Sequence, residues 1–254
     1  MVRSRVLVAS ENAGVRGALS AEAPVTFVVN DHELATLLCT PHDLHDLAVG
    51  WLFAEGLIDS PREVVSLAGC ANDREMLIRT ALERPTTLGE RWRLVTSGCG
   101  GAANPGALRA EDVPKVGDGL RLSVSRLREL ASAMLRATAL YRQTGGVHAA
   151  ALATAQSLVV VREDIGRHNA VDKAIGHALR SGTSLDGLLL LSTGRLSSEM
   201  VWKAARAGLQ LAASVSIPST LARDLAEAAG LTLVGRVVSS QPTIYTRPDR
   251  LAAE

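Results

Sequence analysis

Alternating apolar and polar residues near the start of the chain predict a β-hairpin that is followed by a helix. Val25–Asn30 and Leu34–Thr40 both have the period of two that is typical of strands, and Asp31 and His32 between them can form the turn. From Asp43 onwards the apolar residues recur at helical spacing. The first third of the chain is therefore expected to be a small α+β unit. Three further β-like segments in it are Val64–Ala68, Met76–Ala81 and Trp92–Val95.

The second half of the chain alternates strands and helices in a regular order. Leu188–Ser192 is almost continuously apolar, as expected for a strand in a sheet that is covered on both faces. Repeated strand–helix–strand units imply a mainly parallel sheet in an α/β layer fold. The other predicted strands are Ala149–Ala153, Leu158–Arg162, Leu209–Val215 and Leu231–Val238. The predicted helices are Leu127–Tyr141, His168–Leu179, Ser197–Ala207 and Ser219–Ala229.

Two segments rich in glycine or proline lie between these halves. Thr96–Gly106 contains four glycines and one proline, so it cannot form the interior of a helix or strand and should be a loop. Pro114–Gly119 is also loop-like. We therefore expect two domains. Residues 1–118 would form an α+β domain that includes Cys99, and residues 119–254 a larger α/β domain, whose ligands would bind beyond the carboxyl ends of its strands.

Composition and charge argue against several classes of protein. The 27 Lys and Arg residues nearly balance the 26 Asp and Glu residues, so the net charge is only +1 and no overall positive field favours nucleic acid. No apolar run approaches the roughly 20 residues that cross a bilayer. Residues 1–10 lack the apolar core of a secretory signal. We expect a cytoplasmic protein that binds neither nucleic acid nor membrane.

The cysteines Cys39, Cys70 and Cys99 are widely spaced and form no C-x-x-C pair, which argues against a disulfide framework and against a bound metal. Cys99 is the candidate nucleophile, because glycines on both sides leave its thiol few neighbours to bury it. The alternative is a cysteine in a tight turn with no chemistry. Cys39 lies in an apolar segment and is expected to be a small buried side chain.

Charged residues gather where two predicted strands end. Val161–Lys173 places Arg167 and His168 at the junction of a strand with a helix, and Thr193–Glu199 places Arg195 in a similar position. Two arginine-bearing loops at strand ends of one sheet suggest a phosphate-rich ligand. The alternative is a pair of well-capped helix starts with solvated ion pairs.

Longer motifs in a fixed order resemble the FdhD/NarQ family and cover nearly the whole chain. Motifs of this length are more specific than any single pattern above. They are TPHDLHDLAVGWLFAEGLI at Thr40–Ile58, TSGCG at Thr96–Gly100, TGGVHAAAL at Thr144–Leu152, EDIGRHNAVDKAIG at Glu163–Gly176, STGRLSSEMVWKAARAG at Ser192–Gly208, and LTLVG followed by IYT within Leu231–Thr246.

The resemblance implies a cytoplasmic sulfur carrier, often a homodimer, that acts between a cysteine desulfurase and formate dehydrogenase. Sulfur would be taken up as a persulfide on Cys99 and passed to Mo-bis(molybdopterin guanine dinucleotide). The larger domain would resemble the three-layer α/β/α fold of cytidine deaminase. The Arg167 and Arg195 loops are the expected phosphate-binding groups. The segment where the family is described as contacting the cofactor corresponds to Arg236, Val237, Val238, Ser239, Ser240 and Gln241.

This chain departs from the family pattern at two places. The family loop commonly reads C-x-x-C, and Ala102 stands at its second position here, so a neighbouring thiol that could relay the sulfur is lost. The family's C-terminal segment usually carries a phenylalanine and a Gly-Arg pair, where this chain has Arg236, Ser240 and Gln241. A cofactor-binding chaperone that transfers no sulfur and a nucleotide-binding module are therefore the alternatives.

The deaminase-like fold raises the question of zinc chemistry. Zinc deaminases need an H-x-E motif together with P-C-x-x-C. His148 is followed by two alanines, and the chain has no C-x-x-C, so deamination is not expected. A satisfied core histidine is the more common outcome at a position such as His148.

Overall fold

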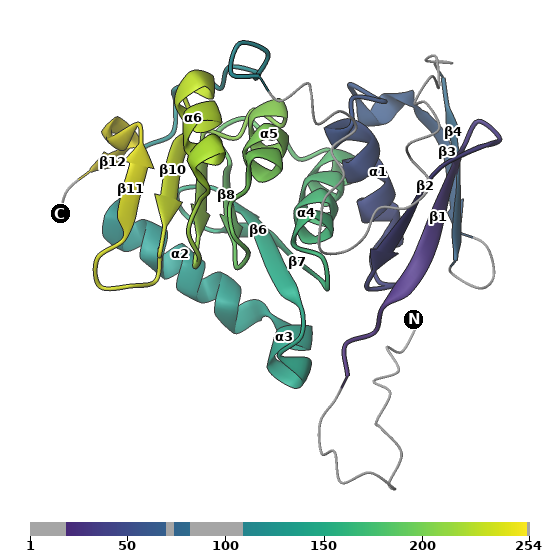
Figure 1. Cartoon of the computed structure of the whole chain (residues 1–254), viewed down its shortest axis with the longest axis horizontal. Helices are drawn as coiled ribbons and strands as arrows, with labels where there is room; N and C mark the ends of the chain where they lie inside the picture. The colour runs from purple at the N-terminus through teal and green to yellow at the C-terminus, as the bar shows by residue number, and fades with distance from the viewer. Residues whose placement is uncertain (1–18, 70–73, 82–108, 253–254) are drawn as a thin grey trace, which may run out of the picture.

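The computed structural model describes residues 19–69, 74–81 and 109–252. The predicted strand Trp92–Val95, Cys70 and the glycine-rich loop with Cys99 lie outside them. The described chain forms a four-stranded sheet and a six-stranded sheet with helices between and around them (Figure 1). A third sheet consists of the short strands β5 (Leu122–Ser123) and β12 (Leu251–Ala252).

The four-stranded sheet confirms the predicted hairpin and the helix after it. Its elements are β1 (Ala23–Val29), β2 (His32–Cys39), α1 (Leu44–Ala54), the 3₁₀ turn η1 (Pro61–Glu63), β3 (Val64–Gly69) and β4 (Glu75–Thr80). The strand order is β2-β1-β4-β3. β1 pairs antiparallel with β2, and Asn30 and Asp31 between them have positive φ angles of 48° and 70°, which suit a two-residue turn. The sheet packs on α1, where the Phe27 and Trp51 rings meet edge-on with centroids 5.4 Å apart.

The six-stranded sheet is mixed, which corrects the prediction of a mainly parallel sheet. Its strands are β6 (His148–Ala153), β7 (Leu158–Asp164), β8 (Leu189–Ser192), β9 (Leu211–Ser214), β10 (Thr232–Gly235) and β11 (Thr243–Thr246), in the order β11-β10-β9-β8-β6-β7. Only β8, β9 and β10 pair in parallel. β6 is antiparallel to both its neighbours, and β11 is antiparallel to β10. The pairs β6–β7 and β10–β11 are joined by short loops, and a parallel pair would need a long crossover.

Helices cover both faces of this sheet, as the α/β prediction required. α2 (Val124–Ala137) lies on one face, and α4 (Arg167–Ser181), α5 (Ser198–Arg206) and α6 (Thr220–Ala229) lie on the other (Figure 1). The core side chains alternate accordingly. Leu189 and Leu191 belong to the cluster that contains Met134 of α2, whereas Leu190 belongs to the cluster that contains Ile175 of α4. The α/β class is confirmed, and the likeness to cytidine deaminase stays a prediction.

Two predicted element boundaries are wrong. The helix expected at Leu127–Tyr141 is divided at Thr138 into α2 and α3 (Ala139–Thr144), because the Glu163 carboxylate accepts three hydrogen bonds from the first backbone N–H groups of α3. The strand expected at Leu231–Val238 ends at Gly235. The 3₁₀ turn η2 (Pro248–Arg250) follows β11. No helix in the described part of the chain is long and apolar enough to cross a membrane.

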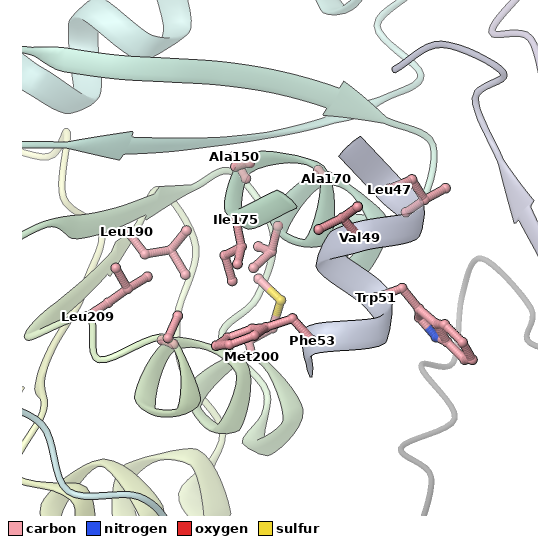
Figure 2. Close-up of a cluster of buried hydrophobic side chains, with 14 of the residues drawn as sticks. Leu47, Val49, Trp51, Phe53, Ala150, Ala170, Ile175, Leu190, Met200 and Leu209 are labelled. Atoms are coloured by element: carbon pink, nitrogen blue, oxygen red, sulfur yellow. The ribbon is translucent and has the colours of Figure 1, made fainter. Parts of the chain in front are cut away.

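The two sheets are joined through α1 and α4, which pack closely. A Cβ atom on Gly50 would stand 1.8 Å from the Asp172 carbonyl oxygen, and one on Gly176 would stand 1.9 Å from the Asp46 carbonyl oxygen, so both positions require glycine. Figure 2 shows Phe53 of α1 beside Met200, whereas Trp51 points away. One hydrophobic cluster therefore spans both sheets. The predicted division at residue 118 stays a prediction.

Candidate functional site

Five strands present their ends at one edge of the six-stranded sheet, and we call it the strand-end edge. His148 at the start of β6 pairs with Asp164 at the end of β7. Ser192 at the end of β8 pairs with Ser214 at the end of β9, and β10 runs parallel to β9. Ligands of open α/β sheets bind beyond the carboxyl ends of the strands. The strand-end edge consists of His148, Asp164–His168, Ser192–Arg195, Ser214–Ser216 and Gly235–Ser239.

Asp164, the last residue of β7, fixes the turn into α4. Its buried carboxylate accepts hydrogen bonds from the backbone N–H groups of Thr40 and Gly166, at 3.0 and 2.8 Å. The ammonium group of Lys173, which is fully buried, pairs with the same carboxylate at 2.6 Å. A buried carboxylate with several donors is well compensated, so the turn has a defined shape. It places Arg167 at the first position of α4.

Arg167 packs against the turn between β8 and α5. A Cβ atom on Gly194 would stand 2.7 Å from the Cβ of Arg167 and 3.0 Å from its Cδ, so this approach needs a residue without a side chain. The Nε atom of Arg167 is buried and has no hydrogen-bond partner in the described part of the chain. Leaving a buried donor unpaired costs about 1–3 kcal/mol. An anionic oxygen bound at the strand-end edge would supply the missing acceptor.

Arg195, the second predicted phosphate-binding residue, lies one position beyond Gly194 and is exposed. The backbone before it is fixed, because the Ser214 hydroxyl donates to the Gly194 carbonyl at 2.6 Å and the Gly194 N–H donates to the Ser192 hydroxyl at 3.1 Å. The structure therefore brings the two predicted arginine loops together. Arg167 packs against the turn between β8 and α5, whereas the Arg195 side chain is exposed to solvent.

A pocket of about 610 Å³ opens at the strand-end edge. Ligand sites are typically roughly 300–1,000 Å³. His148 lines the pocket, and its Nδ1 lies 3.4 Å from the Thr193 hydroxyl, which accepts a hydrogen bond from the Ala149 N–H at 3.0 Å. The pocket therefore combines a held imidazole with a largely apolar wall. Its apolar and aromatic lining residues are Leu135, Tyr141, Val147, Ile165 and Val215, and Arg142 also lines the pocket.

Both histidines of the strand-end edge are kept neutral by their surroundings. Burial lowers the pKa of His148, and the charge of Arg167 lowers it further. Burial also lowers the pKa of His168 to about 3, helped by nearby cations. The His168 Nε2 lies 3.2 Å from both the Ser197 hydroxyl and the Glu199 carboxylate. Because the imidazole is neutral, the contact with Glu199 is a hydrogen bond and not an ion pair, and it ties α4 to α5.

The C-terminal segment predicted to contact the cofactor turns at the same edge. Arg236 has a left-handed φ of 53°, and its N–H donates to the Ser216 carbonyl at 2.8 Å. Val237 is buried, and its N–H donates to the Ser214 carbonyl at 2.9 Å. The hydroxyl of Ser239 is buried with no partner among the described residues. Contact between this segment and a cofactor stays a prediction. Its exposed members are Arg236, Ser240 and Gln241.

Only one of the three cysteines falls within the described residues. Cys39 is fully buried, and burial raises the pKa of its thiol to about 12, helped by the Asp164 charge. A thiol held protonated in the core does not act as a nucleophile, so Cys39 is the buried side chain that the sequence predicted. Cys99 and Cys70 lie outside the described residues, and the role of Cys99 stays a prediction.

Sequence reasoning missed the residues that hold the predicted ones in place. Thr193 positions His148, Asp164 positions the turn before Arg167, and Gly194 provides the surface on which Arg167 lies. Gly194 lies within the predicted Arg195 loop, but its partner Arg167 is distant in the chain, so the contact could not be predicted. Among residues 19–69, 74–81 and 109–252, no three His, Cys, Asp or Glu side chains are grouped as a metal site.

Comparisons with known proteins agree with these motifs. The FdhD/NarQ family model matches residues 20–252. The sulfur carrier protein FdhD of Shouchella clausii is 36% identical over 250 residues, which covers 96% of this chain and 93% of that protein. The protein of the same name from Xanthomonas campestris pv. campestris is 38% identical over 246 residues, covering 94% and 88%.

A solved structure extends the likeness to the fold. A crystal structure ascribed to a formate dehydrogenase accessory protein from Desulfotalea psychrophila matches with a TM-score of 0.77 and 27% identity. The match covers 93% of this chain and 91% of that chain. The chain described here therefore belongs to the FdhD/NarQ family.

Proposed function

We propose that this chain is a sulfur carrier for formate dehydrogenase, which takes up sulfur as a persulfide on Cys99 and passes it to Mo-bis(molybdopterin guanine dinucleotide). The observation that carries the cofactor part is the buried Arg167 Nε, which has no acceptor among the described residues at the strand-end edge. The sulfur part is supported by relatives that match at least 94% of this chain and are named sulfur carrier protein FdhD. Cys99 supplies a glycine-flanked thiol for that role.

The strand-end edge is suited to the phosphate groups of such a substrate. α4 and α5 both begin there, and neither helix has a side-chain hydrogen bond at its N-cap. Helix N-termini attract anions through their unpaired N–H groups and their dipole. Arg167 and Arg195 add two permanent positive charges beside these helix starts. A diphosphate would therefore find both hydrogen-bond donors and opposite charge.

Each sulfur transfer balances in atoms and electrons. In the first, the Cys99 thiolate attacks the outer sulfur of the donor's persulfide, the donor's S–S bond breaks, and the donor leaves as a thiolate. In the second, the S–S bond on Cys99 breaks and its outer sulfur leaves as a sulfide ligand on molybdenum. The reduced metal of the substrate supplies the two electrons for this step, and Cys99 regains a proton as a thiol.

The partners follow from these two steps. The donor would be a cysteine desulfurase, and the recipient of the sulfurated cofactor would be formate dehydrogenase. We place the reaction in the cytoplasm, and we propose that the chain works as a homodimer, as its family resemblance implies.

A second candidate function is favoured by Ala102, which stands where the family loop commonly has a second cysteine. A chain without that thiol could bind the cofactor and hand it over without moving sulfur. This chaperone function would need the strand-end edge but not the thiol of Cys99. The two candidates therefore differ in what replacement of Cys99 does.

Mass spectrometry of peptides from the treated whole chain tests the sulfur carrier directly. After incubation with a cysteine desulfurase and cysteine, the wild-type Cys99 peptide should gain about 32 Da, the mass of one sulfur atom, and a thiol reductant should remove it. Cys70→Ser is the matched control and should gain the same mass. Cys99→Ser should gain none. The absence of added mass on the wild-type peptide would contradict the proposal.

A further inference from the structure

The short helix α3 forms one wall of the pocket at the strand-end edge, although little of its own structure holds it there. It has six residues, none of them is buried, and its N-cap residue Thr138 makes no side-chain hydrogen bond to the helix. Isolated helices shorter than about 12–15 residues are marginal in water. Tyr141 and Arg142 of this helix nevertheless line the pocket of about 610 Å³. Another part of the chain must therefore hold α3 in place.

The Glu163 carboxylate holds this helix. One of its oxygens accepts hydrogen bonds from the Ala139 and Leu140 N–H groups, at 2.8 and 2.9 Å, and the other accepts one from the Tyr141 N–H at 2.8 Å. These are donors that the first turn of a helix leaves unpaired, and a carboxylate also suits the positive end of the helix dipole. The Glu163 carbonyl in turn accepts a hydrogen bond from the buried Lys173 ammonium group at 3.3 Å. One side chain of β7 therefore sets the position of α3.

The last two residues of β7 position the two sides of the strand-end edge. Successive side chains of a strand point to opposite faces of a sheet. Glu163 holds α3 on one face, whereas Asp164 holds the turn before Arg167 on the other, through the Gly166 N–H at 2.8 Å. The pocket and the arginine lie close together, because the Arg167 charge lowers the pKa of His148, which lines the pocket. A ligand at this edge can therefore contact α3 and Arg167 together.

The surface that α3 completes suits a planar ring. Tyr141 is 44% exposed, so its ring is accessible to a ligand at the pocket. Aromatic rings attract one another in offset-stacked or edge-to-face arrangements. Leu135 of α2 and Val215 after β9 add apolar surface to the same pocket. A diphosphate without a ring gains nothing from the tyrosine ring or from these apolar side chains, so this wall favours ligands that carry a ring.

We infer that Glu163 is a positioning residue for ring recognition at the strand-end edge. By holding α3, it keeps Tyr141 at the pocket, where the tyrosine ring packs on a planar heteroaromatic ring of a ligand whose diphosphate lies at Arg167. The inference rests on the proposed function for the diphosphate-bearing ligand, and it adds the residue that sets selectivity for the ring. Without the Glu163 carboxylate, α3 loses three hydrogen bonds at its start and the pocket loses this wall, while Arg167 keeps its place.

Calorimetric titration of the whole chain with two probes, GDP and inorganic pyrophosphate, tests the inference. Glu163→Ala should weaken GDP binding by roughly 3- to 10-fold, the size of one aromatic contact, and should change pyrophosphate binding by less than about 2-fold. Tyr141→Ala should show the same selective loss. Glu163→Gln keeps an amide oxygen that can accept from α3, so it should recover part of the GDP affinity. Glu227→Ala is the matched control, because it removes an equal charge from an exposed position of α6, and it should bind both probes as the wild type does.

Hydrogen exchange shows whether the change is confined to α3. In Glu163→Ala the amides of Ala139, Leu140 and Tyr141 should exchange faster than in the wild type, because they lose their acceptor, while the amides of α4 should stay protected. A general loss of stability would instead raise exchange in both helices and weaken the binding of both probes. That result would overturn the positioning role.

The outcomes separate this inference from the proposed function. If the wild-type chain binds neither GDP nor pyrophosphate, the cofactor site of the proposed function fails. If the wild type binds both probes and Glu163→Ala binds GDP equally tightly, only the role of Glu163 fails. Should Glu163→Ala not fold, Tyr141→Ala and Glu163→Gln decide the question. Wild-type affinity for GDP in both of these variants would then overturn the inference.

Discussion

The interior between the helices and the strand-end edge use polar side chains in opposite ways. In the interior, Lys173 is fully buried and its ammonium group contacts the Asp164 carboxylate at 2.6 Å and the Thr40 carbonyl at 2.9 Å. Nearby, Lys203 lies 2.6 and 2.5 Å from the two carboxylate oxygens of Asp172. At the edge, the Arg167 Nε has no partner among the described residues. The two interior ammonium groups are paired, whereas the Arg167 guanidinium at the edge keeps an unpaired donor within the described part of the chain.

In the proposed function, this difference separates polar groups that specify shape from polar groups that bind a ligand. Paired buried charges define one arrangement of neighbouring elements, and removal of one partner leaves the other uncompensated. An unpaired donor at a strand-end edge instead gains its partner when a ligand binds. Variants that remove one side chain at a time test this comparison. Interior variants should lower the free energy of unfolding, and variants at the edge should lower the affinity for a ligand.

Lys173→Met should have the largest effect. It leaves the Asp164 carboxylate buried without its cation, and breaking a buried pair in this way costs about 3–5 kcal/mol. Urea denaturation should show this loss in the free energy of unfolding. Lys115→Met is the control, because Lys115 is exposed and its loss should cost no more than about 0.5 kcal/mol. Equal effects of the two variants would contradict the role of the interior pair.

Arg167→Ala should weaken the binding of GDP, used as a fragment of the proposed cofactor, by roughly 10- to 150-fold, because hydrogen bonds to charged groups contribute about 1.5–3 kcal/mol. Arg195→Ala is the matched comparison at the same edge. Its side chain is exposed, so the loss should be no more than about 1 kcal/mol. Isothermal titration calorimetry measures both. A larger loss of GDP affinity in Arg195→Ala than in Arg167→Ala would contradict the proposed contrast between the two loops.

The neutral His168 should make the protein less stable in acid. Its folded pKa of about 3 lies below the unfolded value, so the unfolded state binds the proton first as the pH falls from the unfolded pKa towards 3. Stability from this group is complete above roughly pH 6.5 and should fall by about 2 kcal/mol on reaching pH 5. The free energy of unfolding of wild type and of His168→Gln, each measured at pH 7 and pH 5, isolates the contribution of His168 to the slope of stability against pH. An identical slope in both proteins would refute it.

Gly194→Ala should cost about 1–3 kcal/mol of stability from crowding, because the new Cβ would stand 2.7 Å from the Arg167 Cβ, which is fixed to the backbone, so the turn and the start of α4 must move apart. This shift of Arg167 should also weaken GDP binding. Gly119→Ala is the control, since the nearest atom to its Cβ would be a side-chain nitrogen at 4.0 Å. Unchanged GDP affinity in Gly194→Ala would show that Arg167 does not need its place on the β8–α5 turn.

Local sequence patterns were enough to predict the hairpin at β1 and β2, the α/β class and the arginine loops. Periodicity depends on which face of one element is buried, and it is read within a few residues. The mixed sheet was not predictable in this way, because strand direction depends on how loops connect distant strands. The end of β10 at Gly235 was missed because apolar residues continue to Val238, although Val237 is buried in a turn.

Local sequence patterns could not predict the partners of the site residues either, because these partners are distant in the chain. Arg167 was identified, but its contact with Gly194 arises only when two strand-to-helix turns meet at the strand-end edge. His148 was expected to be satisfied in the core, and only the pocket shows that it has a second, open side. The contact of Thr193 with His148 likewise joins β8 to β6. Tertiary structure, not residue type, determines these contacts.

Complementation tests the central claim, that sulfur travels on Cys99, most directly. In a strain that lacks its own accessory protein, the wild-type chain and the control Cys70→Ala should both restore formate dehydrogenase activity. Cys99→Ala should restore none, although it should bind GDP as the wild type does. Full activity with Cys99→Ala would contradict the sulfur carrier and leave the cofactor chaperone as the function of the strand-end edge.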